Sequence, residues 1–262
     1  MKTTLLTAAA ASVGIFASSA FAHQTFLLPE QFIWQMDQPV DISLTSALSF
    51  PDLAHGPAQD RIALAEIVTG GVPVDDVSYS ETETVLGVQF SPAAPGFARV
   101  AVSFKSRSGP IAPEDADGYF DEIGASSKVR AAFEALPGSP PLQRSYSKHA
   151  KTFLCIETCM SGNNAATEPV GQALEFVAVG AGNRTYRLLR HGEVLASHSV
   201  DIVPASGDAI ERITSADGTI NIPDTVTGAI MLTSVVISLP ETPDGVYHSD
   251  YATLTLDLTT LP

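Results

Sequence analysis

Basic residues are scarce in this sequence: 14 lysines and arginines stand against 29 aspartates and glutamates, and the net charge is −15. This acidic balance argues against nucleic acid and anionic lipid head groups as partners, because both are themselves negatively charged. Long apolar runs are missing beyond residue 22, since no later stretch approaches the roughly 18 residues that a membrane-spanning helix needs. We therefore expect no stable membrane insertion of the processed chain.

Cysteine is nearly absent as well. The sequence has two cysteines, Cys155 and Cys159, and neither lies near the N-terminus, so we expect no lipid attachment there. In an oxidising compartment, two cysteines this close form a disulfide across a turn, which is the interpretation we favour. The alternative is a copper or other soft-metal site that also uses the thioether of Met160.

Familiar catalytic motifs are missing too. The sequence has no Gly-x-Ser-x-Gly motif, no His-Glu-x-x-His motif and no phosphate-binding glycine loop. No motif supports an enzyme, and we predict a non-catalytic protein.

Residues 1–22 have the pattern of a secretory signal peptide. The segment starts with a positive charge at Lys2, continues with an alanine-rich apolar stretch and ends in Ala20-Phe21-Ala22, a small-residue cleavage site. Cleavage there would produce a periplasmic protein that begins at His23. One lysine would leave with the signal peptide, so 13 basic and 29 acidic residues would remain, a net charge of −16.

A histidine in the first position has distinctive chemistry. Its free α-amine and its imidazole Nδ1 can close a chelate ring, so His23 alone offers two nitrogen ligands of the kind that suits nickel, cobalt, copper and zinc. A stable site needs one or two more ligands. The candidates are His149 on a predicted strand, His55 in a predicted loop, and His248, which the carboxylate of Asp250 could orient. For each candidate the alternative is an ordinary structural or solvated histidine.

Apolar and polar residues alternate with a period of two through most of the chain, which predicts half-buried strands. The alternation is clearest over residues 99–105 and 253–258. Further strands are predicted over 40–46, 85–90, 145–156, 173–179, 185–189, 194–203 and 229–238. Turn-forming residues separate them, and residues 215–220 are predicted to form a hairpin turn. The fold class is therefore all-β, with antiparallel sheets.

One region has a helical pattern instead. Between about residues 113 and 137, Ser126 or Ser127 can cap a helix whose apolar residues recur at helical spacing. We interpret this region as a short helical insertion in an N-terminal β-sandwich domain of residues 23–165. A polar, turn-rich segment then leads into a C-terminal β-sandwich, immunoglobulin-like or transthyretin-like, over residues 166–262.

Five segments occur in one order along the mature chain: 23–29 (HQTFLLP), 144–152 (RSYSKHAKT), 171–177 (GQALEFV), 216–218 (ADG) and 251–256 (YATLTL). Together they resemble the bacterial periplasmic family of domain of unknown function 4198 (DUF4198), and the resemblance covers essentially the whole mature chain. It matches His23 to the opening histidine of the family. Because some members are associated with nickel or cobalt uptake systems, it implies a periplasmic accessory protein that handles metal.

The sequence thus predicts a binding protein for a divalent transition metal, nickel or cobalt before copper or zinc, that is accessory to an integral-membrane metal uptake system. Metal binding should weaken as pH falls through the titrations of the imidazole and the α-amine. One alternative is a non-catalytic envelope interaction module that binds a protein or a glycan. Another is a copper enzyme that uses His23, which would need a second histidine beside it.

Overall fold

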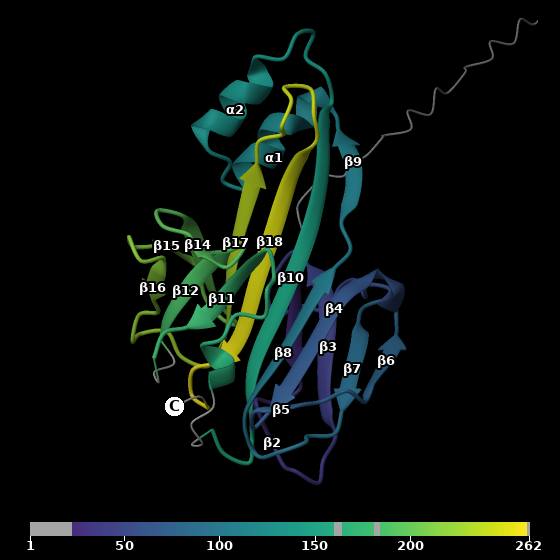
Figure 1. Ribbon diagram of the computed structural model, residues 1–262, viewed down its shortest axis with the longest axis vertical. Coiled ribbons are helices and arrows are strands. Elements are labelled where there is room, and N and C mark those ends of the chain that lie inside the picture. The colour runs from purple at the N-terminus through teal and green to yellow at the C-terminus, as the bar shows by residue number, and fades with distance from the viewer. Residues whose placement is uncertain (1–22, 160–163, 181–183, 261–262) are drawn as a thin grey trace, which may run out of the picture.

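The computed structural model describes residues 23–159, 164–180 and 184–260, so the predicted signal peptide and Met160 lie outside the described residues. The fold is all-β with a short helical insertion, as the sequence predicts (Figure 1). The strands are β1 Gln24–Pro29, β2 Ile33–Trp34, β3 Val40–Ala47, β4 Ile62–Thr69, β5 Val72–Pro73, β6 Val77–Glu81, β7 Leu86–Phe90, β8 Gly96–Phe104, β9 Arg107–Ile111, β10 Leu142–Ile156, β11 Leu174–Ala178, β12 Thr185–Arg190, β13 Glu193–Val194, β14 Ser199–Pro204, β15 Ile210–Ile213, β16 Thr219–Asn221, β17 Ala229–Ser238 and β18 Tyr247–Asp257. The α-helices are α1 Ala116–Glu122 and α2 Ser127–Glu134, and a 3₁₀ turn, η1, covers Gln59–Arg61.

One large sheet runs through the molecule, with the strand order β15-β14-β17-β18-β10-β8-β4-β5. Its centre is β10, which pairs in parallel with β18 over residues 144–152 and antiparallel with β8 over residues 153–156. Two smaller sheets flank it, one in the order β1-β3-β7-β6 and the other formed by β11, β12, β13 and β16. The large sheet therefore continues across the boundary predicted near residue 165, and that boundary stays a prediction.

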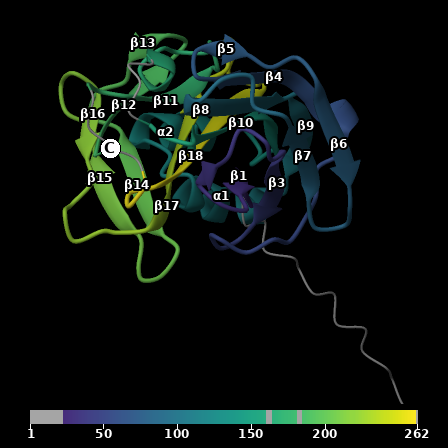
Figure 2. The same cartoon turned by 90° about the horizontal axis from the view of Figure 1, so that it is seen from below.

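Two sandwich cores form against this shared sheet, and the view in Figure 2 separates them to the right and the left. In the first core, the small β1-β3-β7-β6 sheet packs on β4, β8 and β10. In the second core, the β11-β12-β16 strands pack on β14, β17 and β18. Buried residues of the first core include Leu27, Leu44, Val88, Val102 and Leu154, and those of the second include Phe176, Leu188, Ile202, Leu232 and Leu254.

The central strands differ from the half-buried strands that the alternation predicts. Every residue of β8 is buried, and so is nearly every residue of β18. The polar face of β18 is covered because its threonines bind the backbone of β1: Thr253 Oγ1 donates to the Thr25 carbonyl oxygen at 2.7 Å, and Thr255 Oγ1 donates to that of Leu27. The alternating polar residues of β18 therefore form hydrogen bonds with a neighbouring strand and are not exposed to water.

The helical insertion lies between β9 and β10 and covers the ends of β10, β17 and β18 (Figure 1). Tyr119, Phe120 and Val129 are buried there against residues of β18 such as Tyr247. Ser126 caps α2 by accepting a hydrogen bond from the Val129 N–H at 3.4 Å, so one of the two predicted caps is confirmed. Within the described residues, no helix has the length and apolar character needed to cross a membrane.

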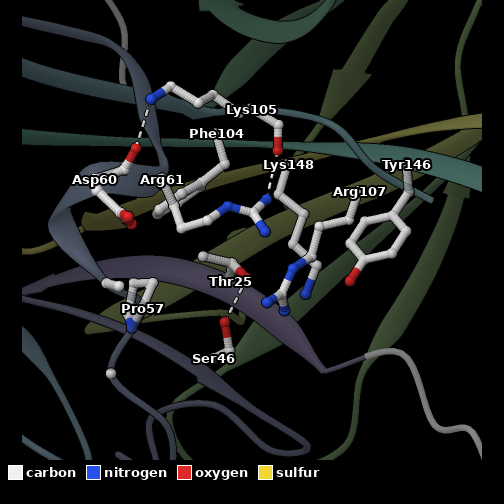
Figure 3. Close-up of a pocket in the computed structure, with 12 residues that line it drawn as sticks. Thr25, Ser46, Pro57, Asp60, Arg61, Phe104, Lys105, Arg107, Tyr146 and Lys148 are labelled. Carbon is white, nitrogen blue, oxygen red and sulfur yellow. Dashed lines mark hydrogen bonds between the residues drawn. The ribbon is translucent and has the colours of Figure 1, made fainter. Parts of the chain in front are cut away.

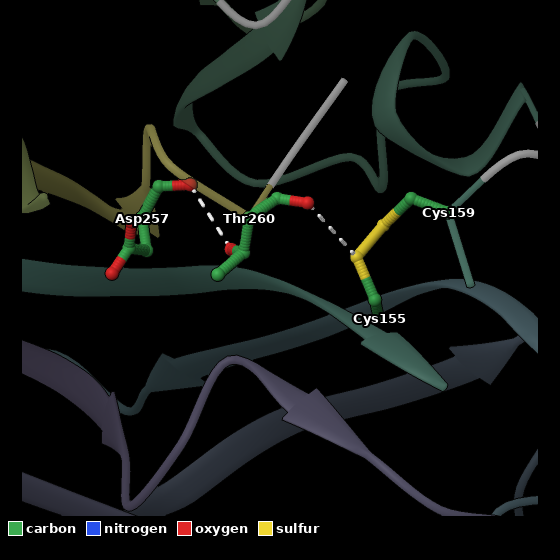
Figure 4. Close-up of a disulfide and its surroundings, with 4 residues drawn as sticks. All are labelled: Cys155, Cys159, Asp257 and Thr260. Atoms are coloured by element: carbon green, nitrogen blue, oxygen red, sulfur yellow. Dashed lines mark hydrogen bonds between the residues drawn. A yellow bond between two sulfur atoms is a disulfide. The ribbon is translucent and has the colours of Figure 1, made fainter. Parts of the chain in front are cut away.

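Cys155 and Cys159 form a disulfide at the end of β10 (Figure 4). Cys155 Sγ lies 3.8 Å from the carbonyl oxygen of Thr260, which follows the end of β18. The predicted disulfide is therefore present, and the alternative of a thiolate metal site is wrong because both sulfur atoms are used.

The predicted hairpin turn at residues 215–220 is a tight turn, closed by Gly218 N–H bonding to the Ser215 carbonyl oxygen at 2.9 Å. The strands on either side do not pair with each other, since β15 pairs with β14 and β16 pairs with β12. The predicted turn is therefore confirmed, but the pairing of its two strands is not, because local turn residues indicate a reversal of direction and do not specify the sheet that each strand joins.

Candidate functional site

Strand register brings His23 and His55 together at one end of the first sandwich. In the β1–β3 pair, Thr25 lies opposite Ser46, and His55 bridges Ser46 from the other side through backbone hydrogen bonds of 2.9 and 3.1 Å. Residues opposite one another project to the same face of a sheet, and a residue two positions away shares that face. The two imidazole rings accordingly meet, with centroids 5.1 Å apart and planes at 67°.

The loop that carries His55 is held in place by its backbone. The Ala54 N–H donates to Thr45 Oγ1 at 3.2 Å, and the Gly56 N–H donates to the Glu83 carbonyl oxygen at 2.8 Å. A Cβ at Gly56 would lie 2.5 Å from a backbone carbonyl oxygen, so only glycine fits this close approach. His55 itself is exposed and His23 is half-buried, so the ring pair is reachable from solvent on a fixed frame.

A cavity of about 520 Å³ adjoins this histidine pair (Figure 3). Gly56 and Pro57, which directly follow His55, form part of its wall. Lys148 of β10 forms another part, and its Nζ donates a hydrogen bond to the carbonyl oxygen of His23. The other residues of the wall are Thr25, Ser46, Ala58, Asp60, Arg61, Phe104, Lys105, Arg107 and Tyr146.

His149 and His248 form a second cluster, around the carboxylate of Asp250. His248 Nε2 lies 3.2 Å from Asp250 Oδ1, and His149 Nε2 lies 3.5 Å from the same oxygen. The second ring nitrogens meet hydroxyl groups, Ser145 Oγ at 2.7 Å from His248 Nδ1 and Ser103 Oγ at 2.9 Å from His149 Nδ1. The parallel register of β10 and β18, which sets Ser145 opposite His248, creates this arrangement.

The charge of Asp250 is maintained by its neighbours. Burial raises the pKa of this carboxyl group, which is 2% exposed, but the two neighbouring imidazoles of His149 and His248 together outweigh burial, and its pKa is lowered. Asp250 Oδ1 forms a hydrogen bond with His248 Nε2 at 3.2 Å and so orients this ring, whereas His149 Nε2, at 3.5 Å, is close enough for charge attraction but forms no hydrogen bond. The arrangement holds the two imidazoles in fixed positions beside one buried carboxylate.

The four candidate histidines thus lie in two pairs, His23 with His55 and His149 with His248. No three histidine, cysteine, aspartate or glutamate side chains in the described ranges gather into a group that could hold a metal ion. The basic residues of the cavity were not predicted from the sequence as site residues. They come from three separate segments, and only Lys148 lies in a motif, so no local pattern could have shown that they converge.

Comparisons with known proteins name no family for this chain. No family model matches it, and no curated protein matches it. Among solved structures, a Bacteroides ovatus mixed-linkage glucan utilization locus protein, SGBP-B in complex with a mixed-linkage heptasaccharide, is 12% identical with a TM-score of 0.22. A biofilm associated protein, BSP domain, is also 12% identical with a TM-score of 0.23. Each match covers 90% of this chain, but the chain spans only 46% and 30% of those two chains.

Proposed function

We propose that this protein binds a divalent transition metal ion, nickel or cobalt, at the His23–His55 pair and presents it to an integral-membrane metal uptake system from the periplasm. The observation that carries the proposal is the 5.1 Å separation of the two rings. A metal is the cargo in this reading, so the site must release it as well as bind it.

The donor set fits such an ion. Signal cleavage after Ala22 would add the α-amine of His23 to the two imidazoles, giving three nitrogen donors, which is a set that suits nickel, cobalt and copper. The described residues supply no carboxylate to this group. The remaining coordination positions would hold water or ligands of a receiving protein, and an exposed ring on His55 leaves room for that transfer.

A second histidine beside His23 is also what the copper alternative needs, so metal identity must be part of the test. Calorimetric titration with nickel, cobalt, copper and zinc should compare protein that begins at His23 with protein that carries one extra glycine before it. The extra residue removes the amine from the chelate while leaving both rings.

We expect binding by the processed protein to weaken at least tenfold in the extended form and in His55→Ala. The control is His191→Asn, which removes a turn histidine with φ 49°, a conformation that asparagine tolerates. Equal binding by processed and extended protein would contradict the amine chelate. Copper binds most nitrogen sites more tightly than nickel or cobalt, so only copper binding with no measurable nickel or cobalt binding would favour the copper alternative. Absence of metal binding would favour an envelope interaction module.

A further inference from the structure

The cavity beside the histidine pair collects positive charge in an acidic protein. Four of the chain's 14 basic residues line it, while its one acidic residue is Asp60. The four are Arg61 of η1, Lys105 directly after β8, Arg107 at the start of β9 and Lys148 of β10. In a chain of net charge −15, such a concentration needs a physical reason.

None of these four cationic groups forms a salt bridge within the described part of the chain. Within the described stretches, none of them has a carboxylate oxygen within 4.0 Å, whereas Arg99, Arg130, Lys151, Arg184 and Arg187 each have one. Three of the four bind backbone carbonyl oxygens: Arg61 binds that of Lys105, Lys105 that of Asp60, and Lys148 that of His23. A carbonyl group orients a cation but leaves its charge uncompensated.

The end groups of three of these residues face one space. Figure 3 shows the guanidinium groups of Arg61 and Arg107 and the ammonium group of Lys148 directed toward the region beside Thr25 and Ser46. They approach from two walls, because Arg61 comes from the loop before β4 while Arg107 and Lys148 come from β9 and β10. A ligand with negative groups at both ends would meet a cation at each wall.

The environment of Lys148 shows that gathering these cations is costly. Its ammonium group lies between two aromatic rings, 5.9 Å from the centroid of Tyr146 and 5.8 Å from that of Tyr251. Arg144 and Arg107 repel this ammonium group, and the weaker attraction of the Glu122 carboxylate acts against that repulsion. A bound anion would relieve this repulsion, and guanidinium groups bind carboxylates and phosphates through paired hydrogen bonds.

We propose that this cavity binds a small organic anion that carries two or more carboxylate or phosphate groups. Its volume of about 520 Å³ falls in the range of small-molecule sites and exceeds what one inorganic ion fills. Tyr146 and Phe104 offer apolar contact for the carbon skeleton of the ligand. This inference does not depend on the proposed metal function, because different side chains carry it.

The test is calorimetric titration of metal-free processed protein with citrate and with pyrophosphate, at about physiological ionic strength so that weak surface attraction is screened. Metal should be removed with a chelating resin, because a dissolved chelator is itself a polycarboxylate. Acetate and inorganic phosphate serve as probes with a single anionic group. We expect at least one of the two larger probes to bind at least tenfold more tightly than either single-group probe.

Two variants locate the site. Arg107→Gln and Lys148→Met should each weaken binding at least tenfold. The matched controls, Arg212→Gln and Lys128→Met, remove basic residues outside the cavity and should change affinity less than twofold. Arg107 is exposed, so its replacement tests the site without disturbing the core. Failure of both larger probes to bind, binding of the single-group probes as tightly as theirs, or equal weakening by the controls would overturn the proposal, and none of these results would affect the metal titration.

Discussion

Lys148 and Lys151 lie three positions apart in β10, and because strand side chains alternate they leave the strand on opposite faces. Lys151, which is 1% exposed, donates to Glu175 Oε2 at 2.7 Å and to the Phe176 carbonyl oxygen at 2.9 Å. Lys148 has the backbone carbonyl of His23 and a cavity in front of it. The same strand therefore carries Lys151, whose charge is compensated by a buried carboxylate, and Lys148, whose charge faces a cavity that we propose binds an anion.

The pKa values support this contrast. Burial lowers the pKa of both ammonium groups to about 8. At Lys151 the carboxylate of Glu175 raises the pKa against burial and outweighs the repulsion from Arg99. At Lys148 the neighbouring Arg144 and Arg107 lower the pKa as burial does, and the Glu122 carboxylate, which raises it, has a smaller effect. The charge of Lys151 is stabilised by its buried partner. The charge of Lys148 lowers the stability of the fold, because like charges surround it, unless an anion is bound.

The largest expected effect comes from breaking the compensated pair. Lys151→Met should lower the free energy of unfolding by about 3–5 kcal/mol, because the buried Glu175 carboxylate loses its cation. Backbone N–H groups of Val170 and Gly171, each at 3.0 Å, would be its remaining partners. Urea unfolding followed by circular dichroism measures the change.

Lys128→Met, an exposed replacement of the same kind, is the control for Lys151→Met and should stay within about 0.5 kcal/mol of the wild type. A loss below about 1 kcal/mol in Lys151→Met would mean that the pair contributes little.

Lys148→Met should have the opposite sign. Removal of a charge that lies among like charges should leave the free energy of unfolding unchanged or raise it by about 1 kcal/mol, since methionine keeps most of the apolar stem in contact with the rings. The same urea titration, without added anions, measures it. A loss as large as that in Lys151→Met would show that Lys148 is also a structural residue.

A third prediction concerns pH. The two lysines have pKa values of about 8 in the folded protein and 10.5 as model values, so between these limits the unfolded chain binds more protons and stability rises with pH. The destabilisation that comes from holding the two charged ammonium groups in the folded protein is fully present below about pH 8, and it decreases as the pH rises above that value. We expect the unfolding free energy to rise from about pH 7.5 to about pH 9.5, below the range where tyrosines ionise.

The rise should be smaller in Lys148→Met than in the wild type, by less than about 1 kcal/mol per pH unit. Urea midpoints at several pH values in that interval give both slopes. A fall in stability over the interval would contradict the lowered pKa values of both lysines.

Several parts of the fold could be predicted because they depend on local pattern. The strand predicted over 40–46 is β3, that over 229–238 is β17, and the cap of α2 is Ser126. In contrast, β1 was not predicted, because its apolar run lacks alternation. It forms a strand because β3 and the threonines of β18 supply its hydrogen-bond partners.

The candidate site divides in the same way. The sequence identified His23, His55 and the association of His248 with Asp250, since each depends on residue type or on neighbours in the chain. It could not show that His55 bridges Ser46, which is what sets its ring beside that of His23. Alternation places Lys148 and Lys151 on opposite faces of the strand, but it could not show which of the two would meet a carboxylate.

The sequence by itself therefore determined the all-β class, the helical insertion and the residues with chemistry worth examining. A period of two specifies which side chains share a face, and turn residues specify where the chain reverses. Only the tertiary structure decided that β10 pairs in parallel with β18, from a distant part of the chain, and that Arg61, Arg107 and Lys148 face one cavity. The physical reason is that strand partners are selected by burial and hydrogen bonding over the whole chain, which no local pattern encodes.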